Sequence, residues 1–126
     1  MTHTDPANED WQLDFEWLRV RTFLKDALNR INLPDFQEVL FLIGLQELGR
    51  LKDGFTKEEK QDLIHIATCE LLSIDGYYKF KGRDQDGWPH YDRVKKIPFE
   101  GVGPQEHYLK QKITEYFSIQ LQESES

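Results

Sequence analysis

The hydrophobic positions of this chain fall into segments with helical spacing, and the most apolar segment covers residues 36–52. Large apolar residues occupy one stripe of this segment and most of its other faces: Phe36, Val39, Leu40, Phe41, Leu42, Ile43, Leu45, Leu48 and Leu51. A helix that is apolar nearly all round is buried by its neighbours. Asp35, directly after Pro34, can cap its start, and Asp53-Gly54 provides a stop signal. The sequence therefore predicts a central buried helix over residues 36–52.

A segment from about Asn8 to about Asn32 precedes the central helix and predicts a helix of its own. Its apolar residues recur at alternating spacings of four and three and form a seam: Leu13, Trp17, Val20, Leu24, Ala27 and Ile31. Such a seam packs on a neighbouring helix at a shallow angle. Because only a short link containing Leu33 and Pro34 follows, we expect the first two helices to form an antiparallel hairpin.

The first half of this helix has a second apolar face, which consists of Trp11, Phe15 and Leu18. A helix with two apolar faces needs two partners. The central helix is one partner, and the other is either the last helix or a second copy of the protein. Exposed apolar patches are uncommon in soluble monomers, which favours cover within the same domain. Large aromatic residues also suit a protein interface, so these three residues are the candidate contact surface.

The second half of the chain predicts a third helix, a β-hairpin and a fourth helix. Thr56 and Glu59 have the spacing of a capping box, and a helix follows to about Ser73. Pro104 suits the first turn of the last helix, and the polar tail from Gln122 is expected to fray.

The hairpin is predicted from two aromatic segments, 77–81 and 88–94, which flank the turn residues 84–87. A four-residue loop gives two favourable cross-strand pairs, Phe80 with Tyr91 and Lys79 with Asp92. A two-residue loop at Asp86-Gly87 would shift this register.

These patterns predict a mainly α fold, with four helices arranged around the buried second helix and one β-hairpin between the third and fourth. The 126 residues fit a single helical domain, 1–126, with short disordered termini at about 1–8 and 122–126. No segment has the length of a membrane span. The one cysteine, Cys69, cannot form an internal disulfide, which agrees with a cytoplasmic location.

The charge of the chain is −7, which argues against general binding to nucleic acids. Residues 77–96 differ from this average because they carry six basic and three acidic side chains among five aromatic rings. Rings and cations together can hold a nucleotide or another phosphate-bearing ligand, and a helix that begins near Pro104 would attract the same anion. The candidate ligand-binding residues are Arg83, Trp88, His90, Arg93 and His107. The simpler interpretation is that the rings pack the hairpin and the cations face water.

Two further features have weaker chemical interpretations. Glu47 falls on the buried stripe of the central helix, either as a carboxylate with a raised pKa or as an ion-pair partner of Arg50. His65 and Cys69 are four residues apart on one helix face, which suits two metal ligands or a Cys–His pair. No third ligand completes a metal site, and no cofactor motif is present, so neither a metal nor a cofactor is expected.

The sequence thus favours a small cytoplasmic interaction or accessory protein, with a protein partner or a second copy bound through Trp11, Phe15 and Leu18. The alternative is a binding protein or enzyme for a small anionic ligand, built from the hairpin and the start of the last helix. No catalytic set converges, which argues against an enzyme, and no membrane association is expected. No motif in the chain identifies a family.

Overall fold

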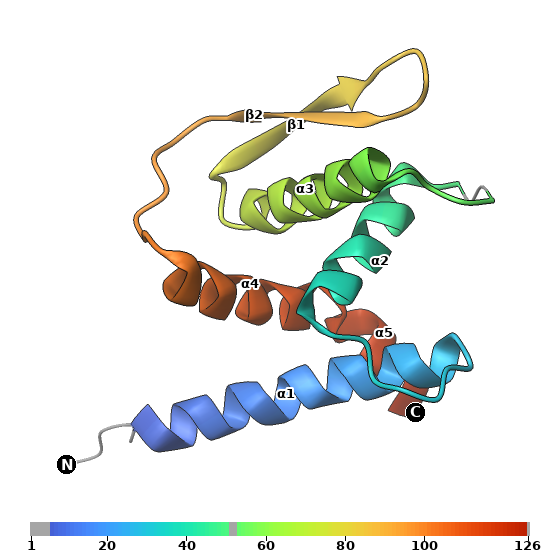
Figure 1. The fold of residues 1–126 in the computed structure, drawn as a ribbon. Coiled ribbons are helices and arrows are strands. Elements are labelled where there is room, and N and C mark those ends of the chain that lie inside the picture. The colour runs from blue at the N-terminus through green and yellow to red at the C-terminus, as the bar shows by residue number, and fades with distance from the viewer. Residues whose placement is uncertain (1–5, 51–52, 126) are drawn as a thin grey trace. The chain divides into compact units, whose positions relative to one another are not determined.

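The computed structural model describes residues 6–50 and 53–125, and within these residues it contains five helices and one two-stranded antiparallel sheet (Figure 1). The sheet is a hairpin between the third and fourth helices. The predicted mainly helical class and the position of the hairpin are therefore confirmed, whereas the number of helices is five and not four. The contacts divide the chain into two compact units, Met1–Leu33 with Val102–Ser126, and Pro34–Gly101. A single domain over 1–126 stays a prediction.

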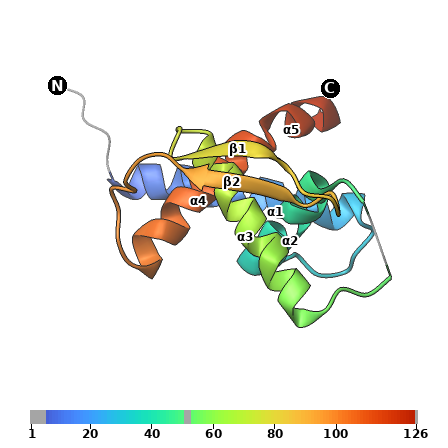
Figure 2. The same ribbon diagram turned by 90° about the horizontal axis from the view of Figure 1, so that it is seen from above.

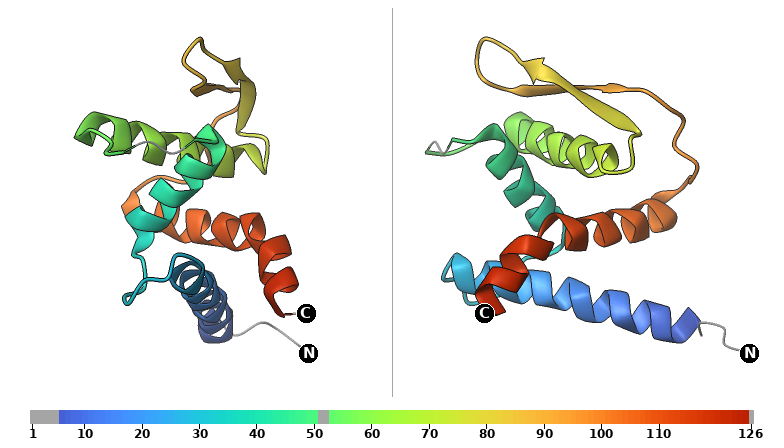
Figure 3. Two further views of the ribbon diagram at one scale, coloured as in Figure 1. Left: turned by 90° about the vertical axis from the view of Figure 1, so that its right-hand side faces the viewer. Right: turned by 180° about the vertical axis from the view of Figure 1, so that it is seen from behind.

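The first unit consists of α1 (Pro6–Ala27), α4 (Val102–Tyr116) and α5 (Ser118–Glu125). Helix α1 contacts both α4 and α5, and the view from behind shows α5 beside the last turns of α1 (Figure 3). Trp17 belongs to the buried seam of α1. The ammonium group of Lys110, a residue of α4, lies over the Trp17 ring, 5.5 Å from the ring centroid. The structure groups α1 with α4 and α5. The predicted pairing of the first helix with the second stays a prediction.

Helix α1 ends five residues earlier than predicted, because Asn29 terminates it. Asn29 adopts a left-handed conformation, with φ of 55°, and its N–H donates to the carbonyl of Asp26. The next N–H, of Arg30, donates to the carbonyl of Lys25, which completes a Schellman motif. Ile31, predicted to continue the buried seam, is consequently outside the helix and 93% exposed. The helix also begins at Pro6, so Asn8 is not its cap.

The end of the chain is more helical than predicted. Helix α4 begins two residues before Pro104, and the residues from Gln122, expected to fray, continue α5 as far as Glu125. Leu121 explains this, because it is buried, whereas the other large apolar residue of α5, Ile119, is exposed. Burial of Leu121 holds a segment that its own sequence would leave marginal, since isolated helices this short are unstable in water.

The second unit consists of α2 (Phe36–Leu48), α3 (Lys57–Ser73), β1 (Tyr78–Arg83) and β2 (Pro89–Arg93). Both helices begin with a complete capping box, the predicted one at Thr56 and Glu59 and another at Asp35 and Glu38. Each box satisfies backbone N–H groups that the first turn leaves free. The buried residues of α2 are Val39, Leu40, Ile43, Gly44 and Leu48.

The predicted end of α2 at Asp53-Gly54 is wrong. The helix ends at Leu48, because Gly49 adopts a left-handed conformation with φ of 78° and donates its N–H to the carbonyl of Leu45. The predicted helical residues Leu51 and Lys52 lie outside the described residues.

Helices α2 and α3 approach each other closely at Gly44. A Cβ atom at this position would lie 2.7 Å from the carbonyl carbon of Leu63 and closer still to its oxygen. Leu63 and Leu48 belong to the core of this unit, with Ile66 from the next turn of α3. Only glycine therefore permits this spacing of the two helices.

The hairpin lies across α3, as the view from above shows (Figure 2). Its register places Phe80 opposite Tyr91 and Lys79 opposite Asp92, which confirms these two predicted pairs. The predicted four-residue loop is wrong, because residues 84–88 separate the strands and Arg83 pairs with Pro89. The register shifts between Phe80 and Gly82, so that Lys81 is the extra residue of a β-bulge. Tyr91 ties the hairpin to α3, because its hydroxyl donates to Glu70 over 2.6 Å.

None of the helices among residues 6–50 and 53–125 combines the length and apolar character that a bilayer span requires.

Candidate functional site

The predicted contact surface on α1 is exposed to solvent. Trp11, Phe15 and Leu18 have 68%, 49% and 46% of their surface exposed. The rings of Trp11 and Phe15 are stacked, with centroids 5.7 Å apart and planes 14° from parallel. At 100° per residue these three side chains share one face of the helix. We call this set, Trp11, Phe15 and Leu18, the α1 apolar face.

The opposite side of the same helix is already used within the unit. Trp17, Val20 and Leu24 are buried, and they lie roughly opposite the α1 apolar face. The 4-3 spacing of each set explains the arrangement, because a shift of two residues turns a helical position by about 200°. One seam is therefore part of the core, and the other is exposed.

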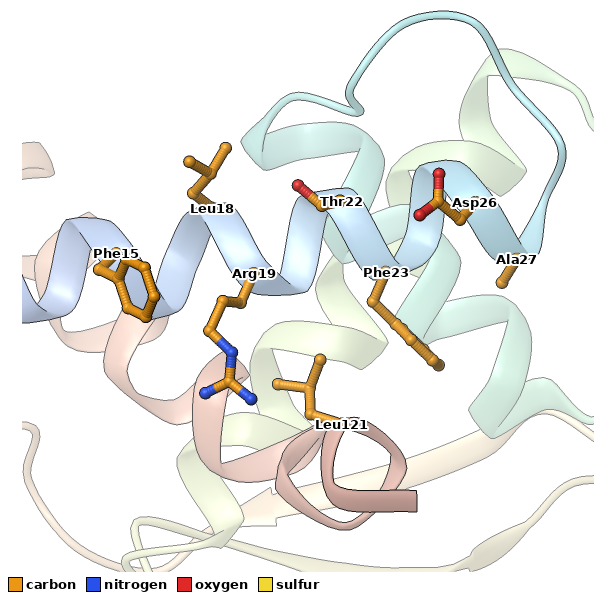
Figure 4. Close-up of a pocket in the computed structure, with 8 residues that line it drawn as sticks. All are labelled: Phe15, Leu18, Arg19, Thr22, Phe23, Asp26, Ala27 and Leu121. Carbon is orange, nitrogen blue, oxygen red and sulfur yellow. The ribbon is translucent and has the colours of Figure 1, made fainter. Parts of the chain in front are cut away.

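A groove of about 610 Å³ continues the α1 apolar face towards α5. Figure 4 shows Phe15, Arg19 and Phe23 on the side of α1 that faces Leu121 of α5. Phe23 is anchored in the unit by Phe117, whose ring centroid is 6.4 Å away. The residues that line the groove are Phe15, Leu18, Arg19, Thr22, Phe23, Asp26, Ala27 and Leu121. Ring and aliphatic carbon thus form most of a concave surface with a few charges.

The charges on α1 are separated along the helix. From Pro6 to Leu18 it contains four acidic and no basic residues, and from Arg19 to Ala27 it contains three basic residues and one acidic residue. Arg19 and Glu16 form an ion pair of 2.8 Å at the boundary between the two halves. The sequence of α1 is therefore acidic in its first half and basic in its second half.

The residues predicted to bind an anionic ligand lie in both units, and the hairpin contributes four of them. Arg83 is bound to the end of α2. Its guanidinium donates to the carbonyls of Glu47 and Leu48 over 2.6 and 3.2 Å, and to that of Gly87 over 2.9 Å. These α2 carbonyls lie in the last turn, where a cation is favourable. The side chain of Arg83 thus joins the hairpin to α2.

Trp88 and His90 share a second groove, of about 450 Å³, in the unit of α2 and α3. Nε2 of His90 lies at hydrogen-bond distance, 2.9 Å, from a carboxylate oxygen of Asp84. Asp84 also accepts the N–H groups of Asp86 and Trp88, and the His90 contact is the main reason that the pKa of Asp84 is lowered. The groove is lined by Glu59, Asp62, His65, Ile66, Asp84, Trp88, Pro89 and His90. Three carboxylates and no lysine or arginine line it, which suits an anion poorly.

The other two predicted ligand residues lie elsewhere. Arg93 is exposed at the end of β2, opposite Tyr78. His107 belongs to α4 and so to the first unit, where its Nε2 lies 3.4 Å from the side-chain nitrogen of Gln111.

The remaining chemical candidates are integrated into the unit of α2 and α3. His65 Nε2 lies 3.5 Å from Cys69 Sγ, as their spacing predicts. Burial raises the pKa of the Cys69 thiol to about 11, which keeps it protonated and weakly nucleophilic. Glu47 is half-buried, and its backbone carbonyl accepts from Arg83. Among residues 6–50 and 53–125, no group of three or more His, Cys, Asp or Glu side chains is placed to hold a metal ion.

Sequence reasoning assigned only two of the eight lining residues of each groove to a site, Phe15 and Leu18 in one groove and Trp88 and His90 in the other. Phe23 and Leu121 complete the groove on α1, and the signal for Leu121 was an apolar residue directly before the tail assigned to disorder. His65 and Asp84 face the second groove, although they are 19 positions apart in the sequence. Only the fold brings these segments together.

No protein-family model matches this sequence, and comparisons with curated proteins and with solved structures find no significant match.

Proposed function

We propose that this chain is a protein-interaction module that docks an apolar surface of a partner protein on the α1 apolar face and the adjoining groove. The observation that carries the proposal is the exposed, stacked pair of Trp11 and Phe15, next to Leu18, on a helix whose opposite face is already buried. Large aromatic residues dominate the energetic centres of protein interfaces. A cytoplasmic place of action is part of the proposal, since the one cysteine, Cys69, cannot form an internal disulfide.

The groove supports the same proposal by its shape. Helix-binding surfaces present a row of apolar anchors beside a concavity that takes side chains from the partner. Phe15 and Leu18 belong to both the α1 apolar face and the groove, so a bound helix would contact them together. Arg19 and Asp26 line the same groove and would give its occupant a direction through their opposite charges.

The test is the size of the complex that the full chain forms in extract of its native cells. Size-exclusion chromatography should find the wild type well above its 15.0 kDa monomer mass. Replacing Phe15 and Leu18 together by glutamate should shift the protein to the monomer position. The matched control replaces two exposed valines elsewhere, Val94 and Val102, by glutamate and should leave the complex intact. A wild type that migrates as a monomer, or a complex that persists in the Phe15/Leu18 variant, would contradict the proposal.

The alternative function, binding of a small anionic ligand, has one supporting observation. Trp88 and His90 line the same groove. Against it stand the carboxylates of that groove and the contact of Arg83 with the end of α2. A thermal-shift measurement with inorganic phosphate and nucleotides separates the two functions, because a ligand at 100 times its Kd stabilises the folded state by about 2.7 kcal/mol. The interaction proposal predicts no shift.

A further inference from the structure

We infer that the partner docked on the α1 apolar face is a second copy of this chain, with the two α1 helices antiparallel. This inference rests on the proposed function, because it names the occupant of the same surface. Its grounds are the distribution of charge along α1 and the spacing of the exposed side chains.

The charges of α1 are complementary to themselves only in the antiparallel orientation. Its first half, to Leu18, carries four acidic residues and no basic residue, and its second half, from Arg19, carries three basic residues and one acidic residue. Two parallel copies would set acidic half against acidic half, which is repulsive. Antiparallel copies set each acidic half against the basic half of the other, and complementary charge fixes both orientation and register.

The exposed seam sets the register. Trp11, Phe15, Leu18 and Thr22 follow each other at spacings of four, three and four, as the a and d positions of a coiled-coil seam do. In an antiparallel pair, Phe15 then faces Leu18 of the second copy, and Trp11 faces Thr22 of the second copy. Trp11, the largest side chain of the seam, thus faces Thr22, the smallest. The distance between the two helices can therefore be similar at this pair and at the pair of Phe15 with Leu18.

The same register pairs charges at the edge of the seam. Asp14 and Arg21 lie on one flank of the exposed seam, on either side of its centre. With Phe15 facing Leu18 of the second copy, Asp14 lies beside Arg21 of the second copy. Because the interface is isologous, this pair occurs twice in each dimer.

Sedimentation equilibrium of the purified full chain tests the orientation through a charge exchange at these two positions. The wild type should be a dimer. Asp14→Arg and Arg21→Asp should each raise the dimer Kd by about tenfold or more, since each places two like-charged pairs across the interface. The double variant should return the Kd to within about threefold of the wild-type value, because both pairs are restored in reverse. Asp53→Arg, a matched charge reversal at an exposed position of the other unit, should leave the Kd unchanged.

A second measurement does not depend on the fold tolerating a change at Arg21. An equimolar mixture of Phe15→Cys and Leu18→Cys chains should form the mixed disulfide in preference to either symmetric one. A dominant disulfide between two Phe15→Cys chains would show parallel helices and overturn the inference, as would a double charge variant no tighter than the single variants. If the purified wild type is monomeric while the complex in extract persists and still requires Phe15 and Leu18, the second copy is excluded but the interaction function stands. If both disappear, both proposals fail.

Discussion

The two units use their apolar residues in different ways. In the unit of α2, α3 and the hairpin, contacts between distant segments specify the packing, for example Gly44 against Leu63 and Arg83 on the last turn of α2. In the unit of α1, α4 and α5, one seam of α1 is buried and a second seam of similar size is exposed. The difference shows that large apolar residues at helical spacing do not by themselves mark a core. Whether a face is buried depends on the presence of a neighbouring element.

The largest effect is expected where the two helices of the second unit are closest. Gly44→Ala places a methyl group against the backbone of Leu63, which cannot move as a flexible side chain would. We expect a loss of about 3 kcal/mol in the free energy of unfolding, the upper range for overpacking. Urea denaturation measures this, with Gly103→Ala of α4 as the control, because no atom lies within 4 Å of its added Cβ. A Gly44→Ala protein as stable as the control would refute the close approach of α2 and α3.

Leucine-to-alanine substitutions on the two faces of α1 should lower the free energy of unfolding by different amounts. Leu24 is buried and Leu18 is 46% exposed. Leu24→Ala should cost about 2.5 kcal/mol of unfolding free energy through lost burial and the cavity left behind. Leu18→Ala should cost less than about 0.5 kcal/mol when measured at a concentration where the chain is monomeric. Equal losses would mean that both faces belong to the core and would remove the distinction between the seams.

Arg83 provides a test of the hairpin attachment. Arg83→Ala removes the donors to the carbonyls of Glu47, Leu48 and Gly87, and should lower the free energy of unfolding by about 1.5 kcal/mol. Arg93→Ala, an exposed arginine ten residues away on the same hairpin, is the control and should change it by less than about 0.5 kcal/mol. Equal effects of the two substitutions would show that the contact with α2 contributes nothing.

The smallest expected effect is a local loss of stability of the hairpin loop at acidic pH. Hydrogen bonds from His90 and from the N–H of Trp88 lower the pKa of Asp84 below its usual 3.8. A carboxylate with a lowered pKa stabilises the folded state above its unfolded pKa, and this contribution is lost as pH falls through the folded value. Amide exchange of Asp86 and Trp88 should therefore accelerate below about pH 4 relative to the rest of the hairpin. Asp84→Asn should remove that pH dependence, and an unchanged profile in this variant would exclude Asp84 as its source.

Local chemistry made the starts of α2 and α3 and the position of the hairpin predictable. The capping box at Thr56 depends on residues three positions apart. The pairing of Phe80 with Tyr91 was found from the position of the turn, although the loop is one residue longer than predicted and Lys81 is the extra residue of a bulge. The residues at which the helices end were harder to predict than the residues at which α2 and α3 begin. Gly49 and Gly54 are both stop signals, and the apolar Leu51 between them favoured the later one. Asn29 adopts the left-handed conformation less readily than glycine, so its stop signal was weak.

Helical periodicity predicted which residues of the candidate site share a helix face, but it did not predict whether that face is exposed. Spacing placed Trp11, Phe15 and Leu18 on one face, but their exposure depends on which elements the rest of the chain supplies. Arg83 was assigned to ligand binding because its sequence neighbours are aromatic and basic. Its contact with Leu48 spans 35 positions of sequence, and no local pattern contains that information.

The most direct measurement is a fluorine NMR dilution series on the unmodified sequence with 5-fluorotryptophan in place of its three tryptophans, Trp11, Trp17 and Trp88. Trp11 lies on the exposed seam, and Trp88 lies in the other unit. If the α1 apolar face docks a second copy, the Trp11 resonance will move with protein concentration while the Trp88 resonance stays fixed. A Trp11 resonance that does not change across the whole range of concentration would contradict docking of a second copy at this face.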